Sequence, residues 1–429
     1  MGHPQLDVRV RRVAVSDFGR RRPEPGFRAI DLRSVYQSFV SFSAAKRREA
    51  YFNAYGGQGV RPTDSATMKT TMELPRYDTG KSYDWNYANA PVDLPSTEIP
   101  ECPGEWDFCG LPVDSPLGIP AGPLLNSGWI LYFARLGFSV LTYKTVRSAF
   151  RACYEPPNLL PVEASQLSGN GDVVRHAPAS KSWAISFGMP SKDRTTWQRD
   201  VGAAREGLAP GQVLSVSVVA TPEPDWTLDD MAEDFVRCAK WARDAGAQAV
   251  EANLSCPNVC SQEGQLYKSP VASGEIAARI QTSIPGLPLI LKIGLFDSRD
   301  QAAEFVETVD RFAAALSTVN SVSARIVDRD GEAQFGGLTR GIGGECIRSR
   351  CEAEMRMLAR VIRARGSQLK LIGVGGISSA ADVSERLGAG AHHVQLATAA
   401  MLDPMVAIRI RSELGSGVFT GSLRTQAQV

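Results

Sequence analysis

The stretch from Leu214 to Ser255 carries the clearest structural pattern in the chain and reads LSVSVVA-TPEPDWT-LDDMAEDFVRCAKWARDAG-AQAVEANLS. Its first and last blocks are short apolar runs of strand length. Between them, from Leu228 to Ala245, apolar residues recur at spacings of three and four, as on the buried face of a helix. A strand, a helix and a second strand in this order predict a parallel βαβ unit.

The same alternation of apolar runs and helical patterns extends over the chain from about Leu111 onward. The candidate strands are Leu117 to Pro123, Val140 to Val146, Leu214 to Ala220, Ala247 to Ser255, Leu287 to Ile293, Thr318 to Ser323, Leu369 to Val374 and His393 to Ala397. Further helical patterns lie near Ser273 to Thr282, Ala302 to Ala315, Glu352 to Arg365 and Ala380 to Leu387. Eight strand–helix repeats over roughly 310 residues predict an α/β fold, a (β/α)8 TIM barrel. A doubly wound parallel sheet is the alternative.

The chain divides into three regions that differ in hydrophobic periodicity. Residues 1–105 show little sustained periodicity, and we expect an irregular N-terminal extension that acts as a lid or an interface segment. An amphipathic stretch near Ile30 to Phe52 predicts a helix, and the arginine clusters of this region are interpreted as a solvated face. Residues 106–420 form the predicted barrel, and residues 421–429 form a C-terminal tail.

The overall composition points to a small-molecule partner. Lys plus Arg is 47 and Asp plus Glu is 46, so no strong net charge attracts nucleic acid or an anionic membrane. The eight cysteines include no Cys-x-x-Cys pair, and we expect no metal site. There is neither an apolar run long enough for a membrane span nor a secretory signal, so the expected compartment is the cytoplasm.

Glycines and polar residues follow the candidate strands at the end where barrels place their active sites. The seventh strand ends in Gly373-Val374-Gly375-Gly376-Ile377, before the helix-capping Ser378 and Ser379, and the eighth ends in Ala397-Thr398. Loops at these two places commonly bind phosphate, which suggests a phosphorylated ligand. Plain tight turns remain the alternative for the glycines. A second glycine cluster, Gly341 to Gly344, precedes a helix.

The fourth strand runs into Asn253-Leu254-Ser255-Cys256-Pro257-Asn258, which would bring two amides and a thiol to the barrel mouth. Amides match the imide edge of a ring, and a thiol near a cation can act as a base. Alternatively, Cys256 is a buried small hydrophobic residue. Lys144 and Lys292 stand in apolar strands, where an unpaired charge is costly, and a flavin ring or an anionic ligand would supply the partner.

Together these motifs resemble the dihydroorotate dehydrogenase family, which also includes the pyrimidine-reducing domain of dihydropyrimidine dehydrogenase. The resemblance covers about residues 110 to 415, and the string from Asn253 to Asn258 is its most specific part. It implies an FMN-dependent oxidoreductase in which a hydride passes between flavin N5 and carbon 6 of a dihydropyrimidine, while a base handles the proton at carbon 5. Enzymes with Cys at the position of Cys256 look like the soluble class. A homodimer and a soluble electron acceptor or partner reductase are the expected partners.

The resemblance also assigns roles to individual residues. It implies Cys256 and Lys144 as catalytic residues, and Asn253, Asn258, Asn320, Ser321, Phe187, Gly188 and Met189 as substrate-binding residues. The implied cofactor contacts are Ala121, Gly122, Lys144, Thr145, Lys292, Gly343, Gly344, Gly375, Gly376, Ala397 and Thr398.

Departures from the family pattern lie mostly on the substrate side. The substrate loop, roughly Asn-Ser-x-Gly-hydrophobic-Pro-Asn in the family, here runs from Ile185 to Ser191, so both terminal Asn residues are replaced. Ala397 replaces a glycine, and segment 149–181 is longer than expected. We therefore expect a dihydropyrimidine-like or related cyclic amide substrate that is not plain dihydroorotate.

Three other interpretations remain open. The protein could be a genuine dihydroorotate dehydrogenase with an unusual lid. It could also be a flavin-free phosphate-binding lyase that uses Lys144 or Lys292 as an imine-forming amine. The third is a flavin-binding protein without turnover.

Overall fold

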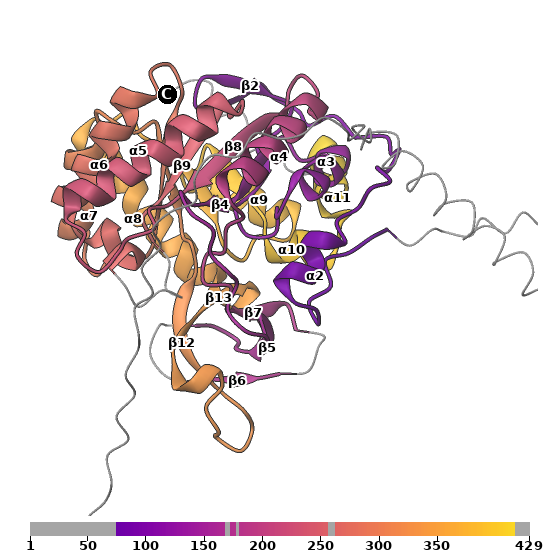
Figure 1. Cartoon of the computed structure of the whole chain (residues 1–429). Coiled ribbons are helices and arrows are strands. Elements are labelled where there is room, and N and C mark those ends of the chain that lie inside the picture. The colour runs from indigo at the N-terminus through magenta and orange to yellow at the C-terminus, as the bar shows by residue number, and fades with distance from the viewer. Residues whose placement is uncertain (1–73, 168–171, 177–179, 256–261, 417–429) are drawn as a thin grey trace, which may run out of the picture. The chain divides into compact units, whose positions relative to one another are not determined.

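The computed structural model describes residues 74–167, 172–176, 180–255 and 262–416 (Figure 1). The helix predicted near residues 30–52 and the tail at 421–429 lie outside the described residues.

Eight parallel strands close into a barrel. In chain order they are β3 (Leu117–Ile119), β4 (Val140–Val146), β8 (Val213–Val218), β9 (Ala249–Asn253), β10 (Leu289–Ile293), β11 (Ala315–Thr318), β14 (Lys370–Val374) and β15 (His393–Gln395). Each strand pairs with the next, and β15 pairs with β3 to close the ring. This topology confirms the TIM barrel and rules out the doubly wound sheet.

Helices alternate with the barrel strands and surround them (Figure 1). They are α3 (Ser127–Arg135), α4 (Arg194–Gly207), α5 (Leu228–Asp244), α6 (Pro270–Ser283), α7 (Arg299–Val309), α8 (Arg348–Arg365), α9 (Ala380–Gly388), α10 (Thr398–Leu402) and α11 (Val406–Gly415). Helix α5 begins at a local sequence signal, because Thr227 and Asp230 form a reciprocal capping box. Ser379 caps α9 in the same way, as the sequence predicts.

Several predicted boundaries were wrong, and the first strand, predicted from Leu117 to Pro123, ends at Ile119. The helical pattern from Ala302 to Ala315 ends at Val309, because Ala315 already belongs to β11. The sixth strand, predicted from Thr318 to Ser323, instead ends at Thr318. The apolar residues Val319 and Val322 continue the run past this point, so periodicity alone could not locate the break.

A second, five-stranded barrel was not predicted. It consists of β5 (Leu159–Glu163), β6 (Asp172–Arg175), β7 (Ser182–Ile185), β12 (Val322–Val327) and β13 (Arg340–Gly344). Its pairs are antiparallel except for the parallel pair of β6 with β12. The strands come from the segments after β4 and after β11, and they lie together below the main barrel in Figure 1. They have their own apolar core, which includes Val162, Ala184, Ile326 and Ile342.

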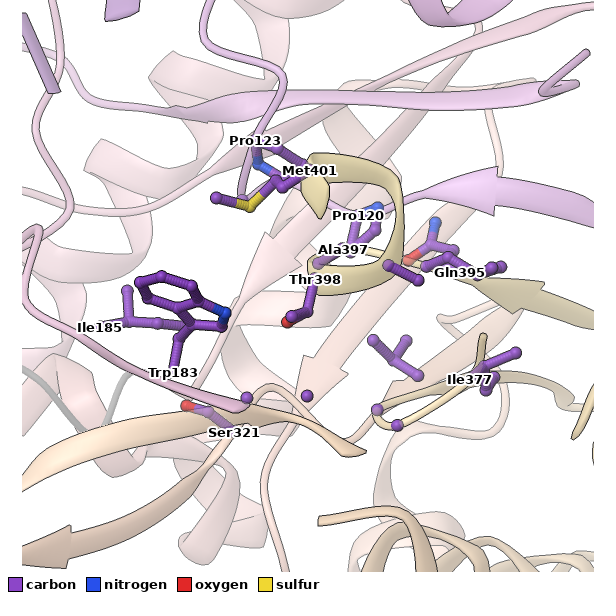
Figure 2. Close-up of a pocket in the computed structure, with 18 of the residues that line it drawn as sticks. Pro120, Pro123, Trp183, Ile185, Ser321, Ile377, Gln395, Ala397, Thr398 and Met401 are labelled. Carbon is purple, nitrogen blue, oxygen red and sulfur yellow. The ribbon is translucent and has the colours of Figure 1, made fainter. Parts of the chain in front are cut away.

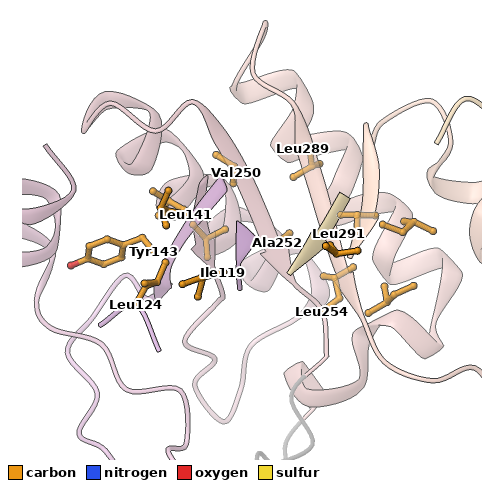
Figure 3. Packing of buried hydrophobic residues seen from close by; sticks show 14 of the residues in the cluster. Ile119, Leu124, Leu141, Tyr143, Val250, Ala252, Leu254, Leu289 and Leu291 are labelled. Atoms are coloured by element: carbon orange, nitrogen blue, oxygen red, sulfur yellow. The ribbon is translucent and has the colours of Figure 1, made fainter. Parts of the chain in front are cut away.

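Residues along the main strands alternate between two environments. Val250 and Leu291 pack outward into the large core shared with helix residues such as Phe235 and Phe305 (Figure 3). Ala249 and Ile290 instead belong to a separate cluster inside the barrel. That cluster also contains Phe108 and Val113 of the hairpin formed by β1 (Trp106–Phe108) and β2 (Leu111–Val113). This apolar cluster fills the barrel interior, and the polar side chains of the predicted site lie at the carboxyl ends of the strands.

The remaining regular elements are short. They are the helix α2 (Tyr83–Ala88) and the 3-10 helices η1 (Gln262–Lys268), η2 (Phe335–Gly337) and η3 (Glu345–Ile347).

Candidate active site

A cavity of about 400 Å³ lies at the carboxyl ends of the barrel strands, beside the five-stranded barrel (Figure 2). Among the residues singled out from the sequence, those lining it are Ala121, Gly122, Lys144, Thr145, Ile185, Phe187, Met189, Asn253, Lys292, Asn320, Ser321, Gly343, Gly344, Gly375, Gly376, Ala397 and Thr398. The fold thus brings together residues in or just after seven strands of the main barrel and two strands of the five-stranded barrel. Cys256 and Asn258 lie outside the described residues.

Two buried lysines contribute positive charge to the cavity. Lys292 on β10 lies 3.8 Å from the Glu251 carboxylate on β9, and both side chains are almost fully buried. The charge of Lys292 therefore has a partner within the chain, whereas the sequence led us to expect that a ligand would supply this partner. The ammonium of Lys144 on β4 lies 5.0 Å from the ring centre of Phe187, a cation–π contact.

Two linked amides, Asn253 and Asn320, also line the cavity. The Asn320 side-chain nitrogen donates to the Asn253 side-chain oxygen at 3.3 Å, and it also contacts the Ser255 carbonyl. The Asn253 nitrogen lies 3.4 Å from the Thr145 hydroxyl. The Ser255 hydroxyl donates to the Lys292 carbonyl at 3.2 Å, which ties the end of this strand to its neighbour. The network holds the amides in one orientation at the cavity surface.

The wall formed by β7 and the following loop is largely apolar. Trp183, Ile185, Phe187 and Met189 all line the cavity. The Ser186 hydroxyl instead accepts a hydrogen bond from Arg340 Nε at 2.8 Å, and Ser186 is absent from the cavity lining. Because successive strand residues point to opposite faces, Ser186 does not replace the amide that Ile185 lacks.

The predicted glycine contacts fall into two kinds. A Cβ added to Gly122 would meet nothing within 4 Å, and one added to Gly343 would lie 3.4 Å from Ile185 and 3.6 Å from the Thr398 hydroxyl. At Gly375 and Gly376, which have positive φ, a Cβ would come within 2.6 Å of the first turns of α8. The latter pair is thus required for packing of α8, in addition to lining the cavity. Gly188 does not line the cavity, and it packs closely on the Tyr154 ring.

The described part of the N-terminal region reaches the same site. Thr79 lines the cavity, and the ring of Tyr83 on α2 lies 5.9 Å from that of Phe187. The Tyr83 backbone N–H donates to the Asn158 side-chain oxygen at 2.9 Å. These contacts fix the loop that carries Phe187.

A described thiol lies near Lys144 and is not activated. Burial raises the pKa of Cys153 to about 11, although the charge of Lys144 acts in the opposite direction. Cys153 stays a neutral thiol at physiological pH and is not among the cavity-lining residues.

Sequence reasoning missed several polar residues that line the cavity, among them Thr79, Lys181, Trp183, Glu345, Gln395, Asp403 and Arg409. Gln395 lines it from β15, and its nitrogen donates to the Thr142 hydroxyl at 3.2 Å. Trp183 lies two positions before Ile185 on the same face of β7. Strand alternation would have revealed Trp183 if β7 had been recognised.

Comparison with known proteins agrees with this geometry. The family model described as dihydroorotate dehydrogenase matches residues 215–418. A protein named dihydroorotate dehydrogenase from Dictyostelium discoideum is 33% identical over an alignment of 368 residues that covers 80% of this chain and 98% of that relative. The chain therefore belongs to the dihydroorotate dehydrogenase family. It is an oxidoreductase of the class that acts on CH–CH bonds.

Bacterial relatives match over shorter regions. The catalytic subunit of a dihydroorotate dehydrogenase B (NAD(+)) from Geobacter sp. strain M21 is 32% identical over 40% of this chain and 54% of its own length. A dihydroorotate dehydrogenase A (fumarate) from Limosilactobacillus reuteri is 28% identical over 42% of this chain and 58% of its own length. Among solved structures, DHODH from Eimeria tenella in complex with ferulenol superimposes with a TM-score of 0.62 at 17% identity, covering 81% of this chain and 94% of that one.

The part of the chain that the structure describes contains no helix long and apolar enough to cross a membrane.

Proposed function

We propose that the protein is an FMN-dependent oxidoreductase that transfers a hydride to or from a C–C bond of a dihydropyrimidine-like ring. One observation carries the proposal: a single cavity at the barrel mouth combines several glycines, two buried lysines and a linked pair of amides. The proposed setting is a cytoplasmic homodimer that passes electrons to a soluble acceptor or a partner reductase.

The residues present fit a flavin nucleotide. Gly122 leaves open space in which a flat ring can approach the backbone, and Lys292, paired with Glu251, places its ammonium group at the cavity. The loops at Gly375-Gly376 and at Ala397-Thr398 stand where barrels commonly hold a phosphate group. When bound, FMN would supply the hydride-accepting and hydride-donating centre.

The protein's own residues would bind and orient the second ring. Asn253 and Asn320 offer a donor and an acceptor each, which match the amide edge of a pyrimidine. Lys144, which lines the cavity and contacts the Phe187 ring, is the proposed lysine that reaches both the flavin and the substrate. Cys256, which follows Ser255 directly, is the proposed group that takes or gives the proton at the carbon next to the hydride-exchanging carbon.

Ile185 sets the proposed limit on the substrate. It lines the cavity, offers no hydrogen bond, and has no polar substitute in Ser186. A polar group of a ligand left unpaired against this wall would cost about 1 to 3 kcal/mol. The proposed substrate is therefore apolar or extended on that side, and is not plain dihydroorotate.

Dihydroorotate itself is the second candidate, because the Dictyostelium relative that matches over 98% of its length bears the name dihydroorotate dehydrogenase. Steady-state kinetics separate the two. A dihydroorotate kcat/KM within about 10⁴ to 10⁸ M⁻¹s⁻¹ would establish the second candidate.

The visible spectrum of the purified protein tests the flavin itself. A yellow protein that releases FMN on denaturation supports the proposal, whereas release of flavin adenine dinucleotide contradicts it. A protein that stays colourless after saturation with flavins would instead favour the lyase interpretation.

A further inference from the structure

The indole N–H group of Trp183 has no role in the proposed reaction. The Trp183 side chain, on β7, is 6% exposed and lines the cavity. The indole nitrogen Nε1 is buried and has no hydrogen-bond partner among the described residues. An indole N–H can only donate, so its partner must be an acceptor.

The surroundings of Trp183 define which part of the cavity it faces. Trp183 is paired with Gly343 in the register of β7 with β13. A Cβ on Gly343 would lie 3.6 Å from the Thr398 hydroxyl, so Gly343 lies between Trp183 and Thr398. Figure 2 shows the indole nitrogen on the edge of the ring that faces Thr398.

The missing partner has a physical consequence. A buried donor without an acceptor costs free energy comparable to a lost hydrogen bond, and most such groups in folded proteins are paired. Because Trp183 lines the cavity, a molecule bound there could supply the acceptor. The neighbouring side chains of Ile185, Phe187 and Met189 on this wall offer no oxygen acceptor.

We propose that the Trp183 indole N–H donates a hydrogen bond to an oxygen of the bound flavin nucleotide, on the part that lies against Gly343 and Thr398. This inference rests on the proposed flavin-dependent function. It makes Trp183 a cofactor-binding residue in addition to those taken from the family pattern. Both a phosphate oxygen and a sugar-alcohol oxygen of the flavin side chain have the required acceptor chemistry.

Titration of the flavin-free protein with FMN tests the proposal without measuring turnover. Trp183→Phe keeps an aromatic ring and removes only the donor with part of the indole, and it should weaken FMN binding about tenfold. Trp183→His, which keeps a ring N–H, should recover part of the loss. The matched control is Trp106→Phe, because Trp106 lies on β1 and lines a different cavity; its FMN affinity should equal that of the wild type.

Riboflavin distinguishes the two kinds of acceptor. If the phosphate accepts the bond, wild type and Trp183→Phe bind riboflavin equally, and if a sugar-alcohol oxygen accepts it, both ligands lose affinity in the variant. An FMN affinity of Trp183→Phe within twofold of wild type would overturn the inference while leaving the flavin function intact. Failure of the wild type to bind any flavin would instead overturn the proposed function itself.

Discussion

The buried pair of Glu251 and Lys292 allows a quantitative test of what holds the active site together. The two charges are 3.8 Å apart, and the side chains are 2% and 6% exposed. At an effective dielectric constant of about 20, two unit charges at this distance attract each other by about 4 kcal/mol. Removing one partner leaves the other charge buried and uncompensated, which typically costs about 3 to 5 kcal/mol.

The perturbation is a double-mutant cycle with Lys292→Met and Glu251→Gln, which preserve side-chain length. We expect each single variant to lose about 3 to 5 kcal/mol of unfolding free energy. We expect the double variant to lose less than the sum of the two, with a coupling of about 2 to 4 kcal/mol. Urea unfolding of the flavin-free protein measures this without involving the cofactor.

The exposed pair of Arg325 and Asp172 is a matched control. Its atoms are closer, at 2.8 Å, but the side chains are 45% and 44% exposed. Its coupling should therefore stay below about 1 kcal/mol. Additivity of the Glu251 and Lys292 variants to within about 0.5 kcal/mol would refute the view that these charges stabilise each other.

Three further predictions concern the reaction, the substrate and the pH dependence of stability. Cys256→Ala should slow reduction of the bound flavin by substrate about 10²- to 10⁴-fold in stopped-flow measurements while flavin content stays unchanged, and an unaltered rate would remove Cys256 as the proton-transfer group. Ile185→Asn should raise kcat/KM for dihydroorotate, and the altered-substrate proposal fails if the wild type already uses dihydroorotate as well as this variant does. Burial lowers the pKa of His393 to about 4, below its usual value of 6.5. Between these two pH values the unfolded chain binds more protons than the folded chain, so the free energy of unfolding decreases as the pH falls, by about 3 kcal/mol in total. His393→Gln should abolish that part of the pH dependence in thermal melts between pH 7 and pH 4, and an unchanged profile would contradict the assignment.

Sequence periodicity was sufficient to identify the main barrel. Strands such as Val140–Val146 and helices such as Leu228–Asp244 have local patterns that do not depend on distant contacts. Since the carboxyl ends of barrel strands converge, placing Lys144, Asn253 and Lys292 there was enough to predict that they meet. Family membership followed from the same residues.

The tertiary structure alone decided what surrounds these residues. The five-stranded barrel pairs segment 159–185 with segment 322–344, and such pairing depends on register between strands far apart in the chain, which periodicity does not encode. The partner of Lys292 and the donor on Trp183 have the same origin, because both depend on which face of one strand meets which face of another. The sequence by itself thus determined the barrel and the polar ends of its strands, whereas the packing of distant segments decided the walls of the cavity and the pairing of its charges.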